Sequence, residues 1–242
     1  LDCPEEKTMV TPNGIRVDNF QGIPGKTEED EGMVNIGAVL RVTPIKDVKT
    51  MIQAFGFAKK REPKLKLWIM GPCEEDPEYA QECFDLVESM EIEDVVFTGR
   101  INVREYLGRM DMTILTSISE GQPLTILEGF AAHKPAIATD VGSGLIHGES
   151  DDFGDAGIVT HIMNVEEITE AMLLLARKEE LRLQMGENGY KRVMKKYRIE
   201  YMQNTYWNIY KDFAESLELP WEEEPVKLPE ETEQETRKSV SK

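Results

Sequence analysis

The sequence contains little cysteine and little histidine, with three residues of each among 242. The cysteines form no Cys-x-x-Cys pair, and a chain of this length can bury enough surface to fold without disulfides. The histidines have no metal-ligand spacing with one another or with the cysteines, which favours ordinary surface or helix-end positions. These absences predict a protein of a reduced, cytosolic compartment that carries no metal site.

Long hydrophobic runs and an excess of positive charge are also missing. The longest apolar runs have the length of a strand, well below the roughly 18 residues that cross a membrane. The chain carries 28 Lys and Arg against 46 Asp and Glu, a net charge of −18. That charge argues against nucleic acid and anionic membranes as the main partners, because both repel an acidic protein. Any anionic ligand would need a local basic site.

From residue 34 onwards, short β-rich runs alternate with longer runs of helical periodicity, which predicts an α/β fold with a parallel sheet. The expected strands cover 34–40, 65–70, 95–97, 112–116, 136–139 and 156–159. The expected helices cover 48–61, 77–90, 103–109, 124–133, 165–177, 180–196 and 199–214. We therefore expect a Rossmann-like parallel sheet of about six strands with helices on both faces.

Composition divides the chain into three parts: an irregular N-terminal segment (1–30), the α/β domain (31–214) and an acidic tail (215–242). The tail has nine Glu, four Lys or Arg and three Pro, so it cannot bury enough surface to offset its ordering entropy. We expect it to be disordered or loosely attached. The sequence opens with Leu1 and shows no signal-peptide pattern, so we interpret it as a fragment or processed chain rather than a secreted protein.

Charge is unevenly distributed along the first half of the domain. Residues 41–66 carry eight Lys or Arg against two acids, whereas residues 74–94 carry ten acids and no base. Most of these charges are typical of solvated helix faces. Arg41 and Lys46 differ, because they fall in the loop after the first strand, where open α/β sheets bind ligands. A guanidinium and an ammonium at this spacing suit a diphosphate, although surface ion pairs with the abundant acids explain these two residues alone equally well.

A second candidate site follows the fourth expected strand. Pro123 suits the first helical turn, and the free amides around Leu124 and Thr125 form a partial positive pole that can hold phosphate oxygens. Glu120 lies on the loop that faces the expected ligand crevice. Glu128 lies about one turn into the helix, where it can accept hydrogen bonds from two ribose hydroxyls. The alternatives are a helix-capping role for Glu120 and a solvated position for Glu128.

These residues resemble motifs of the retaining family-four glycosyltransferases, whose fold is called GT-B. Glu120 and Glu128 match that family's Glu-x7-Glu motif, and Arg41 with Lys46 matches its Arg-x4-Lys phosphate loop. The segments 11–15 and 138–143 are similar to the family's entrance to the domain and its late glycine loop. The four motifs occur in the family's order over about residues 8–214. Their amino-acid sequence most resembles that of the PelF subgroup, which serves Pel exopolysaccharide synthesis.

The resemblance implies one half of a GT-B fold, the carboxyl-terminal Rossmann-like domain that binds the donor. Arg41 and Lys46 would neutralise the diphosphate leaving group, Glu128 would hold the ribose, and Glu120 would lie near the donor sugar. The uracil would sit at Arg100 and Ile101. The family's motifs also assign Gly121, Gln122, Pro123, Leu124, Thr125 and Gly142 to donor binding. The glycine loop departs from the family after Ser143, where this chain is shorter.

The implied function is transfer of a hexose from a UDP-sugar to a growing exopolysaccharide or other glycan, with no metal and no cofactor beyond the UDP-sugar substrate. The missing N-terminal Rossmann-like domain would bind the acceptor, so the isolated chain is expected to be inactive. Membrane-bound polysaccharide synthase subunits are further expected partners. A non-catalytic nucleotide-sugar binding or assembly module is the alternative. A receiver-type signalling domain fits less well, since it needs acids where Leu40 and Arg41 stand.

Overall fold

The structure is a computed structural model that describes residues 8–141, 143–147 and 153–221. The chain forms two compact units, one of residues 15–196 and one that combines residues 1–14 with 197–242. Residues 1–7 of the irregular N-terminal segment and 222–242 of the acidic tail lie outside the described residues.

The larger unit is built on a six-stranded parallel sheet with the strand order β3-β2-β1-β4-β5-β6. The prediction of a Rossmann-like parallel sheet with helices on both faces is therefore confirmed. All neighbouring strands pair in parallel, and β1 lies between β2 and β4. The strands are β1 (Val34–Val39), β2 (Leu65–Met70), β3 (Val95–Gly99), β4 (Met112–Leu115), β5 (Ala136–Thr139) and β6 (Gly157–Thr160).

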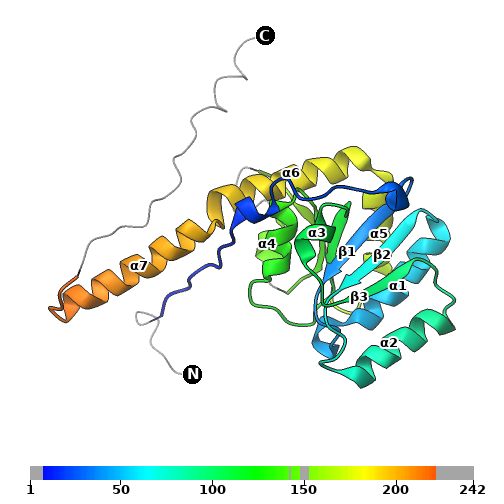
Figure 1. The fold of residues 1–242 in the computed structure, drawn as a ribbon, viewed down its shortest axis with the longest axis horizontal. Helices are drawn as coiled ribbons and strands as arrows, with labels where there is room; N and C mark the ends of the chain where they lie inside the picture. Colours follow the sequence, from blue (N-terminus) through cyan, green and yellow to red (C-terminus); the bar gives the residue numbers. More distant parts are fainter. Residues whose placement is uncertain (1–7, 142, 148–152, 222–242) are drawn as a thin grey trace, which may run out of the picture. The chain divides into compact units, whose positions relative to one another are not determined.

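Among the described residues of this unit, six helices cover the sheet, with α1 and α2 on one face and α3 and α4 on the other (Figure 1). Helix α5 packs against α1, and α6 packs against α4. The helices are α1 (Val48–Arg61), α2 (Pro77–Ser89), α3 (Val103–Leu107), α4 (Leu124–Ala131), α5 (Val165–Arg177) and α6 (Glu179–Lys196). Short 3-10 helices cover Val17–Phe20, Glu28–Asp30, Pro44–Lys46 and Ser143–Leu145.

Helix starts agree with the local chemistry of the sequence. The Asp47 carboxylate caps α1 by accepting a hydrogen bond from the Thr50 amide, and Asp76 caps α2 by accepting one from the Tyr79 amide. Pro77 occupies the first position of α2, where its missing N–H costs no helical hydrogen bond. Side-chain caps of this kind fix where each helix leaves the loop at the carboxyl-terminal edge of the sheet.

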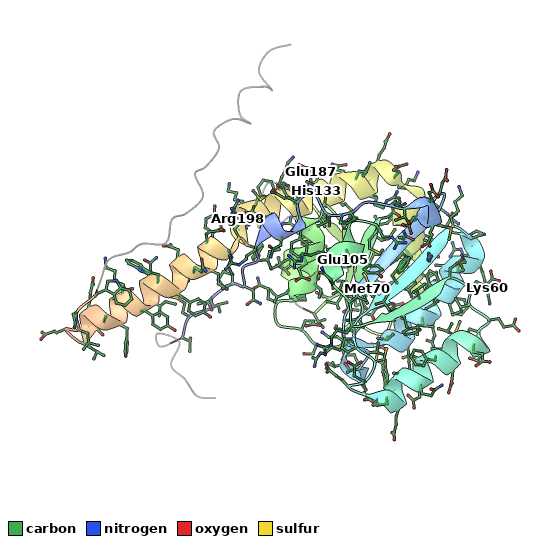
Figure 2. The ribbon with its side chains drawn as sticks, in the orientation of Figure 1. Lys60, Met70, Glu105, His133, Glu187 and Arg198 are labelled. Atoms are coloured by element: carbon green, nitrogen blue, oxygen red, sulfur yellow. The ribbon has the colours of Figure 1, made fainter. Side chains whose placement is uncertain are left out.

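The contact between α4 and α6 is close and includes a ring stack. His133, just beyond α4, stacks on Tyr190 with ring centroids 3.9 Å apart, and its Nδ1 lies 3.1 Å from Oε2 of Glu187 (Figure 2). Glycine allows this approach, because a Cβ at Gly186 would lie 2.2 Å from the His133 carbonyl oxygen. Helix α6 thereby supports the helix that carries part of the candidate site.

The second unit contains α7 (Ile199–Ser216), whose end lies two residues inside the segment predicted as tail. The Thr11 hydroxyl lies 3.0 Å from the Tyr206 hydroxyl, so the N-terminal segment around Thr11 runs beside this helix. Trp207 and Trp221 meet edge to face, with ring centroids 5.6 Å apart, which continues the packing past the helix end. Within the described residues, no helix is both long enough and apolar enough to cross a membrane.

Candidate functional site

The candidate site lies at the point where the strand order reverses. Strands β1 and β4 are neighbours in the sheet although β2 and β3 separate them in sequence. The loop 40–47 after β1 and the loop 116–123 after β4 therefore begin at the same edge of the sheet. Open α/β sheets bind ligands in the crevice at such a reversal, outside the carboxyl ends of the strands. The two sequence-predicted motifs thus come together at one place.

A pocket of about 370 Å³ opens at this edge. Its basic side chains are Arg41, Lys46 and Arg100, and Ile101 and Thr125 also line it. The remaining lining residues are Val39, Leu40, Met70, Gly71, Pro72, Glu75 and Val103, among which Met70 is labelled at the end of β2 in Figure 2. Three cations against one carboxylate suit a polyanion with an apolar part. Five residues predicted from the sequence therefore line a single pocket.

Lys46 connects the pocket to the loop after β4. Its Nζ donates a hydrogen bond to Oε1 of Glu120, and the two side chains are only 16% and 14% exposed. The same Oε1 accepts a second hydrogen bond from the Ser117 hydroxyl at 2.6 Å, and Ser117 is fully buried. Two donors therefore share one oxygen of Glu120, and Glu120 does not cap α4, whose start has no side-chain cap.

Arg41 and Arg100 pair with acids of the loop after β2. Nη1 of Arg41 donates to Oε2 of Glu75 at 3.0 Å, and Nε of Arg100 lies 3.9 Å from Oε1 of Glu74. These pairs are more exposed than that of Lys46, with the Arg41 side chain 56% exposed. The basic and acidic runs noted in the sequence thus face each other, and the surface ion pair considered for Arg41 is present.

Helix α4 begins at Leu124, as the sequence predicts. Pro123 is its N-cap with extended ψ (117°) and so lies just before the first helical turn rather than within it. In the described part of the chain, no hydrogen bond uses the N–H of Leu124 or Thr125. The two donors are therefore available at the positive end of the helix. Gly121 is exposed in the preceding loop with Gln122, and Gly142 lies outside the described residues.

Glu128 lies one turn further along α4 than Thr125, on the face that turns toward the pocket. Its side chain is half-buried, and burial raises the pKa of its carboxyl above the ordinary value. Among the described residues nothing donates a hydrogen bond to this carboxylate. A partly buried acceptor of this kind, with no protein donor, is suited to accept hydrogen bonds from the hydroxyl groups of a ligand.

Three contributors to the site escaped the sequence reasoning: Ser117, Glu75 and Gly71. A Cβ on Gly71 would lie 1.8 Å from the Leu40 carbonyl oxygen, so only glycine lets the loops after β1 and β2 meet at the pocket. The sequence marked Gly71 only as the end of a strand. No group of three potential metal ligands occurs in the part of the chain that the structure describes.

Residues 19–192 match the family model described as "Glycosyl transferases group 1". Two curated relatives agree with it. N-acetyl-alpha-D-glucosaminyl L-malate synthase of Bacillus anthracis is 31% identical over 190 residues, covering 78% of this chain and 47% of that protein. Alpha-monoglucosyldiacylglycerol synthase of Streptococcus pneumoniae is 28% identical over 218 residues, covering 83% and 46%. The chain spans about half the length of these curated relatives.

Solved structures share the fold. HepE of Anabaena, solved with UDP and glucose, superimposes with a TM-score of 0.75 at 16% identity over 87% of this chain and 59% of that one. The C-terminal domain of the group 1 glycosyl transferase LpcC from Francisella tularensis gives a TM-score of 0.66 at 23% identity, covering 77% of this chain and 100% of that domain. With the family model matched from residue 19 to residue 192, the chain belongs to the glycosyltransferase group 1 family.

Proposed function

We propose that this chain is the donor-binding half of a retaining glycosyltransferase that transfers a hexose from a UDP-sugar to a glycan. One observation carries the proposal: Arg41, Lys46 and Thr125, which lies in the first turn of α4, line one pocket at the reversal point of the sheet. Cations and helix amides together stabilise the negative charge that develops on a diphosphate leaving group. Membership of the family and the UDP bound by HepE support the choice of nucleotide.

The proposed roles follow the geometry of the pocket. Arg41 and Lys46 bind the diphosphate, the backbone at Arg100 and Ile101 receives the uracil, and Glu128 accepts the ribose hydroxyls. Glu120 lies beside the sugar. The bond between the sugar's anomeric carbon and the diphosphate oxygen breaks, and its electron pair leaves with UDP. A new bond then forms from the oxygen of an acceptor hydroxyl to the same carbon, and the proton of that hydroxyl passes to the departing diphosphate.

The rest of the protein enters this proposal as well. Because the chain spans about half of its relatives, we propose that an N-terminal Rossmann-like domain supplies the acceptor site. LpcC, matched along its whole C-terminal domain, supports the assignment to that half. We also propose the PelF subgroup, an exopolysaccharide as the acceptor, polysaccharide synthase subunits as partners and a cytoplasmic location. Without the N-terminal half, the chain is expected to bind UDP and to transfer nothing.

Calorimetry with UDP in EDTA tests the proposal. We expect binding without a divalent metal, because three cations and Thr125 in the first turn of α4 line the pocket. Lys46→Ala should weaken the binding about 10- to 150-fold, the equivalent of one hydrogen bond to a charged group. Lys60→Ala is the matched control, since it removes the same charge from an exposed position on α1 that does not line the pocket (Figure 2). Equal loss in both variants, or binding that requires Mg²⁺ or Mn²⁺, would contradict the proposed site.

A further inference from the structure

The ammonium of Lys46 has two competing uses, which the proposed function alone does not explain. It lines the pocket, where a diphosphate would bind, yet it donates its hydrogen bond to Glu120 in the loop after β4. Glu120 itself does not line the pocket. Lys46 therefore stands between the proposed diphosphate position and a carboxylate, and both attract the same charge.

The surroundings fix the two loops but leave the ammonium able to turn. The Thr116 hydroxyl donates to the carbonyl oxygens of Lys46 at 3.0 Å and Asp47 at 3.1 Å, and the Ile118 amide donates to the Ile45 carbonyl oxygen at 2.9 Å. These bonds hold the main chain around Lys46. The lysine side chain, in contrast, ends in a point charge with three N–H donors on a flexible stem. Its partner can change while the loops stay in place.

Glu120 keeps a partner of its own if Lys46 turns away. The fully buried Ser117 hydroxyl donates to Oε1 at 2.6 Å, and the Ser117 carbonyl oxygen is held in turn by the Thr139 hydroxyl at 2.6 Å. Oε2 of Glu120 accepts no hydrogen bond from any described residue. A carboxylate with one hydrogen-bonded oxygen and one free oxygen is suited to accept hydrogen bonds from the hydroxyl groups of a sugar.

We propose that Glu120 is the counter-ion which a bound diphosphate displaces from Lys46, so that Lys46 couples the diphosphate position to the sugar position. The inference rests on the proposed function. When a diphosphate binds, Lys46 exchanges a carboxylate partner for a phosphate one, and Glu120 retains the hydrogen bond from Ser117. The carboxylate then carries a negative charge that only the sugar hydroxyls and Ser117 satisfy. Diphosphate without a sugar leaves that charge poorly compensated, whereas a nucleotide sugar compensates it.

The test measures the UDP affinity of the full 242-residue chain. Amide chemical shifts are recorded during titration with UDP up to millimolar concentration, so that variants with weak UDP binding stay measurable. Glu120→Gln should bind UDP about 3- to 10-fold more tightly, because an amide competes less well than a carboxylate for the ammonium. Glu170→Gln is the matched control. It makes the same charge change on the exposed side of α5, where Glu170 pairs with Arg61, and should leave UDP affinity unchanged.

A second background separates exchange at Lys46 from a general effect of charge. In the Lys46→Met background, Glu120→Gln should not increase UDP affinity, because no ammonium remains for which the diphosphate and the Glu120 carboxylate could compete. An equal gain with and without Lys46, or no gain in the wild-type background, overturns the counter-ion role and leaves the UDP site standing. Absence of UDP binding in the wild-type chain overturns the proposed function itself. A melting curve of each variant shows that the variants compared are folded.

Discussion

The guanidinium of Arg109 and the carboxylate of Asp30 form two hydrogen bonds, from Nε to Oδ2 at 2.8 Å and from Nη2 to Oδ1 at 3.1 Å. Asp30 is fully buried, and its Oδ1 also accepts a hydrogen bond from the Asn35 side chain at 2.8 Å. Asn35 lies on β1 and accepts a hydrogen bond from the Trp68 indole of β2 at 3.2 Å. The pair thus ties the segment before β1 to the central strands.

This pair should make the fold sensitive to acid. Burial alone would raise the pKa of Asp30, but hydrogen bonds from Arg109, Thr27 and Asn35 outweigh it and hold the pKa well below its usual range. A carboxyl whose pKa is lowered by folding stabilises the fold above its unfolded pKa, about 3.9, and loses that contribution as the pH falls further. We expect the melting temperature to fall below about pH 4.

Asp30→Asn is the variant that isolates this effect. At pH 7 it should cost about 3 kcal/mol, because it leaves the largely buried Arg109 charge without its buried partner and with only the exposed carboxylate of Glu29, 3.5 Å away. Below about pH 4 the difference from the wild type should shrink, because Asp30 takes up a proton in the unfolded state at a higher pH than in the folded state, which stabilises the unfolded wild-type chain. Glu29→Gln removes the same charge from a side chain that is 79% exposed and should matter little. A difference that stayed constant with pH would rule out the titration of Asp30 as its cause.

Arg192 should stabilise the segment that follows β5. Its side chain is fully buried in α6, and it donates to the carbonyl oxygens of Leu145 at 2.7 Å, Ile146 at 2.8 Å and Gly154 at 2.6 Å. Arg192→Met should lower the free energy of unfolding by roughly 3 kcal/mol and speed amide exchange around residue 146, because it removes all three hydrogen bonds and leaves the buried Leu145 carbonyl oxygen without this donor. Lys191→Met, at an exposed neighbouring position, should change stability by less than about 0.5 kcal/mol.

Secondary structure was predictable from this sequence because its signals are local. The strand at 65–70 and the helix at 48–61 have the predicted bounds, since a β-rich run ends at Gly71 and the helix has a clear apolar period. The helix expected to reach His133 ends at Ala131, because His133 adopts a positive φ of 56°. Periodicity alone gives no warning of such a backbone conformation.

The partners of the site residues were not predictable, because they depend on strand order. Nothing in the sequence places β4 beside β1, and the bond between Lys46 and Glu120 joins residues 74 positions apart. Arg41 and Glu75 were each noted within charged runs, but their pairing needs the loops after β1 and β2 to meet. Asp30 was missed for a different reason. It lies in a segment that is irregular in sequence, where burial leaves no periodic signal.

Gly71→Ala should damage the pocket more than an ordinary glycine substitution. A methyl group there would lie 1.8 Å from the Leu40 carbonyl oxygen, so the loops after β1 and β2 must separate. We expect UDP binding to fall at least about 10-fold, with a loss of stability of a few kcal/mol. Gly25→Ala is the matched control, because a Cβ there meets no atom within 4 Å. Similar UDP affinity in both variants would show that the close approach of the loops does not shape the site.

Glu128 should give UDP binding a characteristic dependence on pH. Its carboxylate accepts hydrogen bonds from the ribose hydroxyls in the proposed complex, so UDP binds more tightly when Glu128 is ionised. Because burial raises the pKa of Glu128, acidification should protonate it at a higher pH than an ordinary glutamate, whose pKa is about 4.3. The contribution of Glu128 to affinity is therefore present above this raised pKa and lost as the pH falls through it.

The measurement compares Glu128→Gln with the wild type by calorimetry from pH 8 down to about pH 4.5. At high pH the variant should bind UDP about 10-fold less tightly, because a hydrogen bond to a neutral acceptor is worth roughly 1 kcal/mol less than one to a charged acceptor. The ratio of the two affinities should then approach one on acidification. Titration of the UDP phosphate affects both proteins equally and cancels in that ratio. A ratio that is independent of pH, or equal to one throughout, would remove Glu128 from the ribose position and leave Arg41 and Lys46 as the only charged contacts proposed for UDP.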